Sequence, residues 1–378
     1  MRPLPLLLAA TLACAGTPHP IPAPVPEPPP GLTEATIFLI GDAGNPAPEG
    51  EPVIEALVQQ VAHAPGSAAV IFLGDNIYPR GLPDSASPAR AEAERRMNGQ
   101  VDPMRPLGVP VFFVPGNHDW AGQGSGGWDA IRREAGYITQ RGGATMRLLP
   151  ADGCPGPVVV DFGAWARLVF VDTQWWLQSG PKPTGAGSGC PAGTEDGVVD
   201  SLRAALAAAG GREVLVLGHH PLASGGPHGG HFTWKDHIFP LRAVNSWFWL
   251  PLPLIGSAYP LARKWGVTAQ DQSNGRNRRM RAALEGAFAD HPPLVYASGH
   301  EHTLQVVGGR TARYVLVSGA GIADHESPTA WSKGTLFALA HPGFQRLDFL
   351  RDGRVRLGVI EVDASGRGVE RFSMWLRN

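Results

Sequence analysis

Side chains that bind metals recur directly after short apolar runs along this 378-residue chain. Each run ends in a polar turn led by glycine. The candidate residues in these turns are Asp42, Asp75, Tyr78, Asn117, His118, His219, His300 and His302. An aspartate after glycine is by itself a common turn residue, and a lone histidine is usually a surface or core residue. Carboxylate, amide, phenol and imidazole groups that recur after several strands instead indicate a site for iron, manganese or zinc.

The apolar runs predict buried strands that would bring these turns together. The strands expected before the turns span residues 36–40, 69–73, 109–114, 167–171, 213–217 and 294–297. Helical patterns separate them at 51–63, 195–209 and 278–290, and further strands are expected at 303–307, 313–318, 335–340, 346–350, 355–362 and 369–375. This order predicts a layered α/β domain over residues 32–378, with polar groups gathered at the carboxyl ends of its strands.

Composition argues against a nucleic-acid-binding protein and against a disordered chain. The chain has 32 lysines and arginines against 33 acidic residues, and this balance gives no sign of a nucleic-acid partner. Apolar residues make up 43% of the chain, enough for a sizeable core, so global disorder is excluded.

The first 31 residues read as a leader and a linker. Residues 1–14 have the charge and the short apolar stretch of a signal peptide. Leu12-Ala13-Cys14 resembles a bacterial lipobox, whereas Ala13-Cys14-Ala15 also fits an ordinary signal peptidase site. Residues 15–31 form a proline-rich linker, and polyproline II over residues 18–30 at ~3.1 Å per residue predicts a spacer of roughly 40 Å. We therefore expect a protein exported to a bacterial cell envelope or periplasm, attached to the membrane through a lipid on Cys14, or otherwise secreted.

Two further features leave alternatives open. Cys154 and Cys190 either pair, as exported proteins permit, or remain two buried thiols, and they lack the spacing of a redox Cys-x-x-Cys motif. An insert at 232–273 holds Trp234, Trp247 and Trp249 among several prolines, and its apolar part is too short to cross a bilayer. This insert is either a packed loop or cap, or a lid that shapes access to a substrate.

Five blocks resemble, in order, the motifs of the calcineurin-like metallophosphoesterases. They are Gly41-Asp42-Ala43-Gly44, Gly74-Asp75-x-x-Tyr78, Gly116-Asn117-His118-Asp119, Gly218-His219 and Gly299-His300-x-His302. The tyrosine that ends the second block is similar to that of the purple acid phosphatases, especially the tartrate-resistant type. The resemblance implies a four-layer αββα sandwich of two mixed β-sheets flanked by helices.

The resemblance also implies two metal ions that share Asp75. The first, ferric in that branch, would bind Asp42, Tyr78 and His302, and the second, divalent iron, zinc or manganese, would bind Asn117, His219 and His300. A shared carboxylate holds two cations ~3.5–4 Å apart, close enough to act on both attacking and leaving oxygens. Tyr78 suits a trivalent ion because a phenol with a reference pKa near 10 must ionise to bind. A metal-bound water would become hydroxide and attack phosphorus.

Catalytic roles follow from the same resemblance. His118 would contact the phosphoryl group and assist the leaving oxygen, and Asp119 could orient it. His228 resembles a further substrate-facing histidine, with His231 as a rival, while His220 is expected beside the site. The expected activity is hydrolysis of phosphomonoesters, on small molecules or phosphoproteins. A phosphodiesterase or nucleotidase on the same metals is the first alternative, and a non-catalytic surface binding protein on this scaffold is the second.

Overall fold

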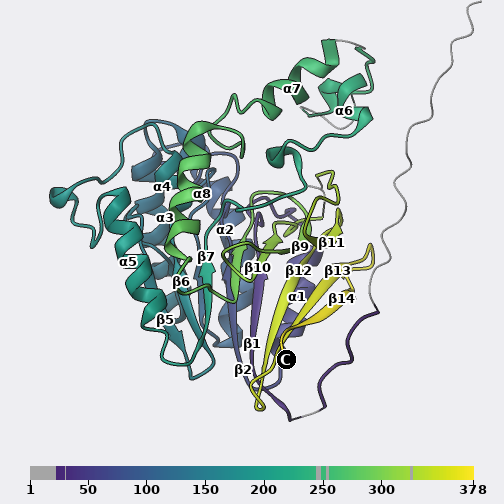
Figure 1. The fold of residues 1–378 in the computed structure, drawn as a ribbon. Coiled ribbons are helices and arrows are strands. Elements are labelled where there is room, and N and C mark those ends of the chain that lie inside the picture. Colours follow the sequence, from purple (N-terminus) through teal and green to yellow (C-terminus); the bar gives the residue numbers. More distant parts are fainter. Residues whose placement is uncertain (1–22, 30, 244–247, 253–254, 324–326) are drawn as a thin grey trace, which may run out of the picture.

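The computed structural model describes residues 23–29, 31–243, 248–252, 255–323 and 327–378 (Figure 1). The expected signal peptide with Cys14, and Trp247 of the insert, lie outside these residues.

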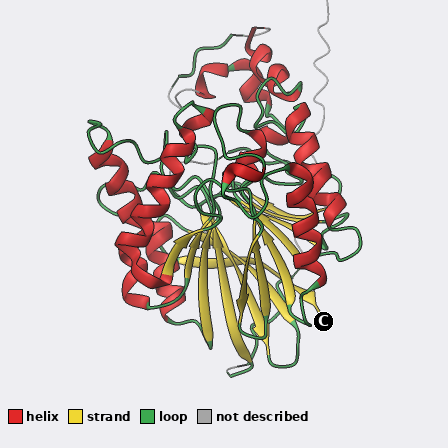
Figure 2. Cartoon of the chain, turned by 90° about the vertical axis from the view of Figure 1, so that its left-hand side faces the viewer, coloured by secondary structure: helices red, strands yellow, loops and turns green. Residues whose placement is uncertain are grey.

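Two seven-stranded sheets form the centre of the fold (Figure 2). The first has the order β14-β13-β12-β1-β2-β3-β4 and the second the order β11-β9-β10-β8-β7-β6-β5. The strands of the first sheet are β1 Thr33–Ile40, β2 Ser67–Phe72, β3 Val111–Phe113, β4 Met146–Leu148, β12 Gly343–Leu350, β13 Val355–Val362 and β14 Gly368–Arg377. Those of the second are β5 Val158–Phe162, β6 Ala166–Phe170, β7 Glu213–Leu217, β8 Val295–Ser298, β9 Leu304–Gly308, β10 Tyr314–Ser318 and β11 Thr335–Leu339.

Both sheets are mixed. In the first, β1 to β4 are parallel neighbours, and β12 to β14 add antiparallel strands beside β1. In the second, β6, β7, β8 and β10 run parallel, while β5, β9 and β11 pair antiparallel. The parallel strands of each sheet therefore end at one edge, as the turn motifs require.

Helices cover the outer faces of the two sheets (Figures 1 and 2). The helices are α1 Pro52–Ala62, α2 Arg90–Met104, α3 Gly127–Gly142, α4 Thr173–Leu177, α5 Glu195–Ala207, α6 Trp234–Ile238, α7 Ala258–Lys264 and α8 Gly275–Ala287. Helix α1 contacts β2 and β12, and α3 contacts β4 of the same sheet. Helices α5 and α8 contact each other and lie beside β5 to β7 (Figure 1). The expected four-layer αββα sandwich is confirmed.

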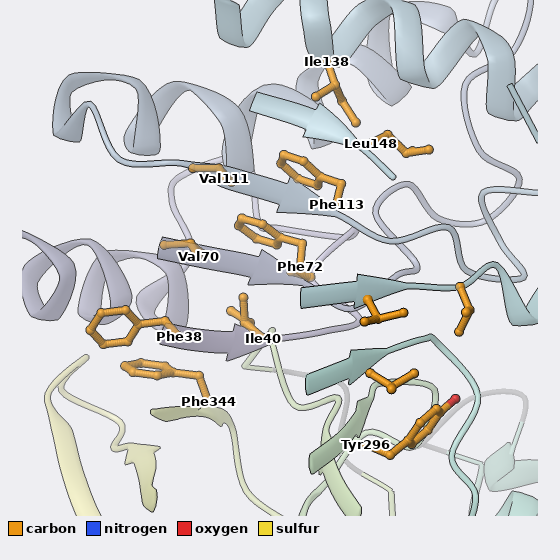
Figure 3. Packing of buried hydrophobic residues seen from close by; sticks show 14 of the residues in the cluster. Phe38, Ile40, Val70, Phe72, Val111, Phe113, Ile138, Leu148, Tyr296 and Phe344 are labelled. Carbon is orange, nitrogen blue, oxygen red and sulfur yellow. The ribbon is translucent and has the colours of Figure 1, made fainter. Parts of the chain in front are cut away.

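Side-chain alternation along β1 shows how the layers pack. Ile37 and Leu39 belong to the apolar cluster between the sheets, whereas Phe38 and Ile40 belong to the cluster beneath the helices. Figure 3 shows Phe38 and Ile40 among the buried residues of this outer cluster, near Phe344. Two neighbouring strands add Phe72 and Phe113, whose stacked rings have centroids 4.6 Å apart. Each parallel strand is thus buried on both faces, which holds the turn at its carboxyl end in place.

The sequence located most of these elements and missed some. Helices α1 and α5 lie inside the expected ranges, while α8 begins three residues before the expected 278. Helices α2 and α3 and strands β4 and β5 were not expected. Helix α2 is rich in charged residues, and Glu92 forms ion pairs with Arg95 and Arg96 at 2.8 Å. Its buried apolar residues, Ala93, Met97, Val101 and Met104, nevertheless recur at the three- and four-residue spacing of an amphipathic helix.

Part of the proline-rich linker lies against the first sheet. The Val25 carbonyl accepts hydrogen bonds from Arg356 at 3.0 Å and from Ser373 at 3.1 Å. Glu27 lies 3.7 Å from Arg346. Residues 23–29 of the expected linker thus run beside the strands that supply these partners.

A disulfide joins Cys154 and Cys190, whose Cα atoms lie 5.5 Å apart. The alternative of two free thiols is excluded in this structure. The bond ties the loop after β4 to the loop before α5, so it links the first sheet to a helix on the second.

The insert at 232–273 lies beyond the carboxyl ends of the strands (Figures 1 and 2). Its described part is helical and contains α6, α7 and the short 3₁₀ turns η6 Pro240–Ala243 and η7 Ile255–Ser257. Leu252 donates a backbone hydrogen bond to Ile238 at 2.7 Å, which holds the two arms of the insert together. Within the described residues, no helix combines the length and apolarity needed to span a membrane.

Candidate metal centre

All seven expected metal ligands meet at the edge where the parallel strands of both sheets end. The turn after β1 supplies Asp42, the turn after β2 supplies Asp75 and Tyr78, and the segment after β3 supplies Asn117. The second sheet supplies the three histidines, His219 after β7 and His300 and His302 after β8. Neither sheet holds a complete donor set, so the site requires the two sheets to pack against each other.

Three of these residues have a backbone conformation that is unusual for side chains other than glycine. The φ angles of Asp42, Asp75 and His300 are 57°, 54° and 71°. Such left-handed residues persist only where the surrounding structure determines them, and they cluster at functional sites. Glycines allow the turns to approach. A Cβ at Gly74 would lie 2.5 Å from Nδ1 of His219, and one at Gly299 would lie 2.5 Å from Oδ2 of Asp42.

Asp42, Tyr78 and His302 form the first group of donors. The Tyr78 hydroxyl lies 3.1 Å from Oδ1 of Asp42 and 3.2 Å from Nε2 of His302. Nε2 of His302 is in turn 3.5 Å from Oδ1 of Asp42. Oδ2 of Asp42 accepts the backbone amide of His300 at 2.7 Å, which fixes the direction of the carboxylate.

Asn117, His219 and His300 form the second group. Nε2 of His219 lies 3.1 Å from Oδ1 of Asn117 and 3.2 Å from Nδ1 of His300. Nδ1 of His219 donates to the Leu73 carbonyl at 2.8 Å, so Nε2 of the neutral ring carries a lone pair. Both histidines are buried.

Asp75 lies between the two groups. Its Oδ2 is 3.4 Å from the Tyr78 hydroxyl and 3.3 Å from Nε2 of His219. Its Oδ1 accepts the backbone amide of His118 at 2.8 Å, which orients the carboxylate. One oxygen of Asp75 thus faces donors from both sheets, as a carboxylate shared by two cations must.

The electrostatics of the cluster favour cations. Burial, Asp42 and Asp75 hold the pKa of Tyr78 well above its ordinary value, so the phenolate needs a nearby positive charge. Burial opposes a charge on His219, yet the Asp75 carboxylate raises its pKa to about 9. Burial keeps the pKa of His300 well below its ordinary value, which leaves the ring neutral. Protons and metal ions compete for the same lone pairs, so a field that attracts a proton here also attracts a metal ion.

The donor chemistry fits a pair of metal ions. Asp42, Asp75 and His219 each present one ligand atom within 4.8 Å of the others. His219 and His300 also group with His220 in this way. The ring nitrogens of His220, however, are engaged by Thr173 at 2.8 Å and by Gln270 at 2.5 Å. This agrees with the expected place of His220 beside the site.

His118 lies beside Tyr78 and Asp75. Its ring lies against Tyr78, with centroids 4.3 Å apart, and Nε2 is 3.9 Å from Oδ2 of Asp75. Nδ1 donates to the Pro79 carbonyl at 2.7 Å. The side chain is partly exposed, as a group that contacts a substrate must be.

The expected orienting contact from Asp119 to His118 is wrong. Asp119 is fully buried and accepts backbone hydrogen bonds from Gly116 at 2.7 Å, Asn76 at 2.8 Å and Ile77 at 3.0 Å. It therefore holds the turn that carries Asp75 against the turn that carries Asn117. Burial and the neighbouring Asp75 carboxylate raise the pKa of Asp119 to about 7.

His228 lies next to the second donor group. It belongs to η5 Pro227–Gly229, and its ring lies against that of His300 with centroids 3.9 Å apart and the planes tilted by 42°. Its Nδ1 accepts a hydrogen bond from Nη2 of Arg263 at 2.7 Å. The structure thus places His228 beside one residue of the second donor group.

Two residues that the sequence did not single out support this loop. Arg263, from α7 of the insert, contacts Oδ1 of Asp271 at 2.6 Å as well as His228. Glu301, between the histidines of the last motif, accepts from Ser224 and Gly229 at 3.1 Å. No local pattern marks Arg263, because its partners lie 35 residues before it and 8 residues after it. Glu301 could have been noticed from the sequence as an acidic residue between the two histidines of the last motif.

Comparison with known proteins identifies the family of this fold. Residues 35–249 match the family model described as calcineurin-like phosphoesterase. Among solved structures, GAP50, the anchor in the inner membrane complex of Plasmodium, is 17% identical with a TM-score of 0.55, over 91% of this chain and 89% of that one. No curated protein sequence matches the chain.

A purple acid phosphatase from yellow lupin seeds, PPD1, is 14% identical with a TM-score of 0.54, over 92% of this chain and 55% of that one. At sequence identities this low, the likeness to these two structures shows a shared fold alone. The family match covers more than half of the chain and includes the first four motif blocks. The chain belongs to the calcineurin-like phosphoesterase family.

Proposed function

We propose that this protein is a binuclear metal-dependent hydrolase of phosphomonoesters. The position of Asp75 is the observation that carries the proposal. Its Oδ2 lies within 3.4 Å of Tyr78 from one donor group and within 3.3 Å of His219 from the other. A scaffold without a catalytic centre has no need for a buried carboxylate shared between two sets of nitrogen and oxygen donors.

We assign a ferric ion to Asp42, Tyr78 and His302, and a divalent iron, zinc or manganese ion to Asn117, His219 and His300. Tyr78 supports the ferric assignment. Burial and two carboxylates oppose its ionisation, and a trivalent cation offsets this best. When bound, such a pair of cations supplies a nucleophilic water at moderate pH and polarises a phosphoryl oxygen.

The two histidines at the mouth of the site would handle protons differently. Nδ1 of His118 donates to a carbonyl, so Nε2 carries a proton only when the ring is positively charged. Nδ1 of His228 accepts from Arg263, so Nε2 carries the proton of the neutral ring. His228 can therefore donate to a phosphoryl oxygen as a neutral group. With Nδ1 donating to the carbonyl, His118 can donate to a leaving oxygen only as an imidazolium.

Metal analysis and a pair of substrates test this proposal. We expect about two metal ions per purified chain, a violet colour, and faster hydrolysis of para-nitrophenyl phosphate than of its bis-ester. Tyr78→Phe should remove the colour, because the phenolate-to-iron transition would be lost. Faster hydrolysis of the bis-ester would favour the phosphodiesterase alternative. Metal-free protein without activity would favour a binding protein on this scaffold, and a colourless enzyme with divalent metals alone would exclude the ferric assignment.

We also propose that the protein is exported and attached to a membrane of the cell envelope through Cys14. The Cys154–Cys190 disulfide supports export, since such bonds persist in oxidising compartments. Mass spectrometry of the mature N-terminus tests the anchor. Diacylglycerol on Cys14 is expected, and an unmodified N-terminus after Ala15 would mean ordinary secretion.

A further inference from the structure

Exposed apolar side chains gather on the insert at 232–273. Among the described residues, ten large apolar side chains are exposed, and nine of these lie in the insert. The nine are Trp234, Phe248, Trp249, Leu250, Ile255, Tyr259, Leu261, Trp265 and Val267. The remaining one is Val159 in β5. Trp265 and Trp234 are 75% and 64% exposed, far more than tryptophan usually is in a folded protein.

The insert does not bury these groups within itself. Phe239 lies against Trp249 with ring centroids 5.2 Å apart, and Phe232 lies against Tyr259 at 6.1 Å. These contacts leave the outer faces of the rings open. In the described part of the insert, the buried residues are Gly256, Pro260, Gln270 and Asp271, and none of them is a large apolar residue. An exposed concentration of this kind marks an interaction surface.

Charge distinguishes the insert from the rest of the chain. The insert has four basic residues against Asp236 and Asp271, which leaves 28 of the 32 basic and 31 of the 33 acidic residues elsewhere. The insert is thus positive and the remainder negative. Arg263 pairs with Asp271. The other three basic residues of the insert therefore outnumber its one remaining acidic residue, Asp236.

The basic residues also stand beside the exposed aromatic ones. Lys235 follows Trp234 in α6, and Lys264 at the end of α7 precedes Trp265; all four are exposed. Tryptophan and tyrosine with neighbouring lysines are typical of the boundary between lipid headgroups and acyl chains. Protein interfaces share the aromatic residues but are depleted in lysine, so they fit this composition less well.

We propose that the insert docks the protein on an anionic phospholipid bilayer. The aromatic and aliphatic side chains would enter the headgroup boundary, and Lys235 and Lys264 would bind lipid phosphates. The insert lies at the same end of the sheets as the metal centre (Figure 1), so docking turns the mouth of the site toward the membrane. The inference does not depend on phosphatase activity, since it rests on exposure and charge alone.

Vesicle binding tests the proposal in the full chain with Cys14→Ser, so that an attached lipid cannot contribute. We expect co-sedimentation with vesicles of phosphatidylcholine and roughly one third phosphatidylglycerol, and weaker binding to phosphatidylcholine alone. A triple variant, Trp234→Ser, Trp249→Ser and Trp265→Ser, should bind at least about tenfold less. Lys235→Gln and Lys264→Gln should each weaken binding about fivefold at low salt.

Val159→Ser is the matched control, because it removes an exposed apolar side chain outside the insert. It should bind like the parent chain, and all variants should keep the parent's melting temperature and metal content. Absence of vesicle binding, or equal binding by the triple variant, would overturn the proposal. So would a dimer in analytical ultracentrifugation that the triple variant abolishes in the absence of lipid, since a second copy would then cover the surface.

Discussion

Three tryptophans of the sandwich and two of the insert differ sharply in exposure. In the sandwich, Trp120, Trp175 and Trp176 are 0%, 2% and 5% exposed. In the insert, Trp249 and Trp265 are 52% and 75% exposed. Trp120 lies three residues after Asn117 and donates to Asp172 at 2.8 Å, so it ties the segment after β3 to the segment after β6. In the insert Trp249 contacts Phe239, yet more than half of its surface and of the surface of Trp265 remains available to another surface.

The difference in exposure matches two different tasks: the sandwich has to position donor atoms precisely, whereas the insert only has to attach to a surface. Donor atoms must be held within fractions of an ångström, which requires close-packed strands on both sides of the site. An attachment surface needs area and charge but little precision, and a short helical insert is sufficient for it. Changes in the sandwich should therefore alter metal binding, rate and stability, whereas changes on the exposed face of the insert should leave all three unchanged.

The largest effect is expected for Asp75→Asn in the sandwich. An amide cannot supply the negative charge that both donor groups face, so metal content should fall and kcat should drop by about a thousandfold or more. Asp172→Asn is the matched control, since Asp172 is also buried after a strand and accepts from the Trp175 amide at 2.9 Å. Asparagine can keep that cap but loses the bond from Trp120, so this variant should lose stability while its metal content stays unchanged. Steady-state kinetics and metal analysis of both variants measure the contrast, and near-normal turnover by Asp75→Asn would contradict a shared ligand.

The second largest effect is expected from loss of the disulfide, which should lower the free energy of unfolding and leave kcat unchanged. The chain-entropy estimate for a cross-link across 36 residues is about 4 kcal/mol of unfolding free energy. Cys154→Ser with Cys190→Ser should therefore lower the urea midpoint, and dithiothreitol should do the same to the parent chain. The double variant should keep its kcat below its new melting temperature. An unchanged midpoint would mean that the bond contributes little beyond the packing around it.

The sequence predicted the sandwich and the clustering of the candidate ligands because strand, turn and donor lie close together along the chain. Asp42 and His219, for example, each follow an apolar run within a few residues, so local pattern and distant geometry agree. It did not predict that Asp119 holds backbone amides, because an aspartate beside a histidine allows either role and tertiary packing decides between them. It also left the cysteine pairing open, because spacing does not give a Cα separation.

Arg263 was missed for the same reason, and it is where the two regions meet. It belongs to the insert, yet its guanidinium is fixed by Asp271 at 2.6 Å and donates to His228 at 2.7 Å. Nδ1 of His228 is also 3.6 Å from Oδ1 of Asp271. Without the guanidinium, this buried carboxylate would draw the ring proton to Nδ1, and Nε2 would lose the proton that it offers to a phosphoryl oxygen.

The smallest effect is therefore expected for Arg263→Met, with KM for para-nitrophenyl phosphate raised about tenfold and metal content unchanged. Arg263→Lys should restore part of the loss, because an ammonium can still donate to Nδ1 of His228. Lys264→Met is the control, since it removes the neighbouring charge of α7 from an exposed position and should leave KM unchanged. Equal KM values for Arg263→Met and Lys264→Met would show that the insert contributes nothing to the site. The insert would then have no part in substrate binding at the metal centre.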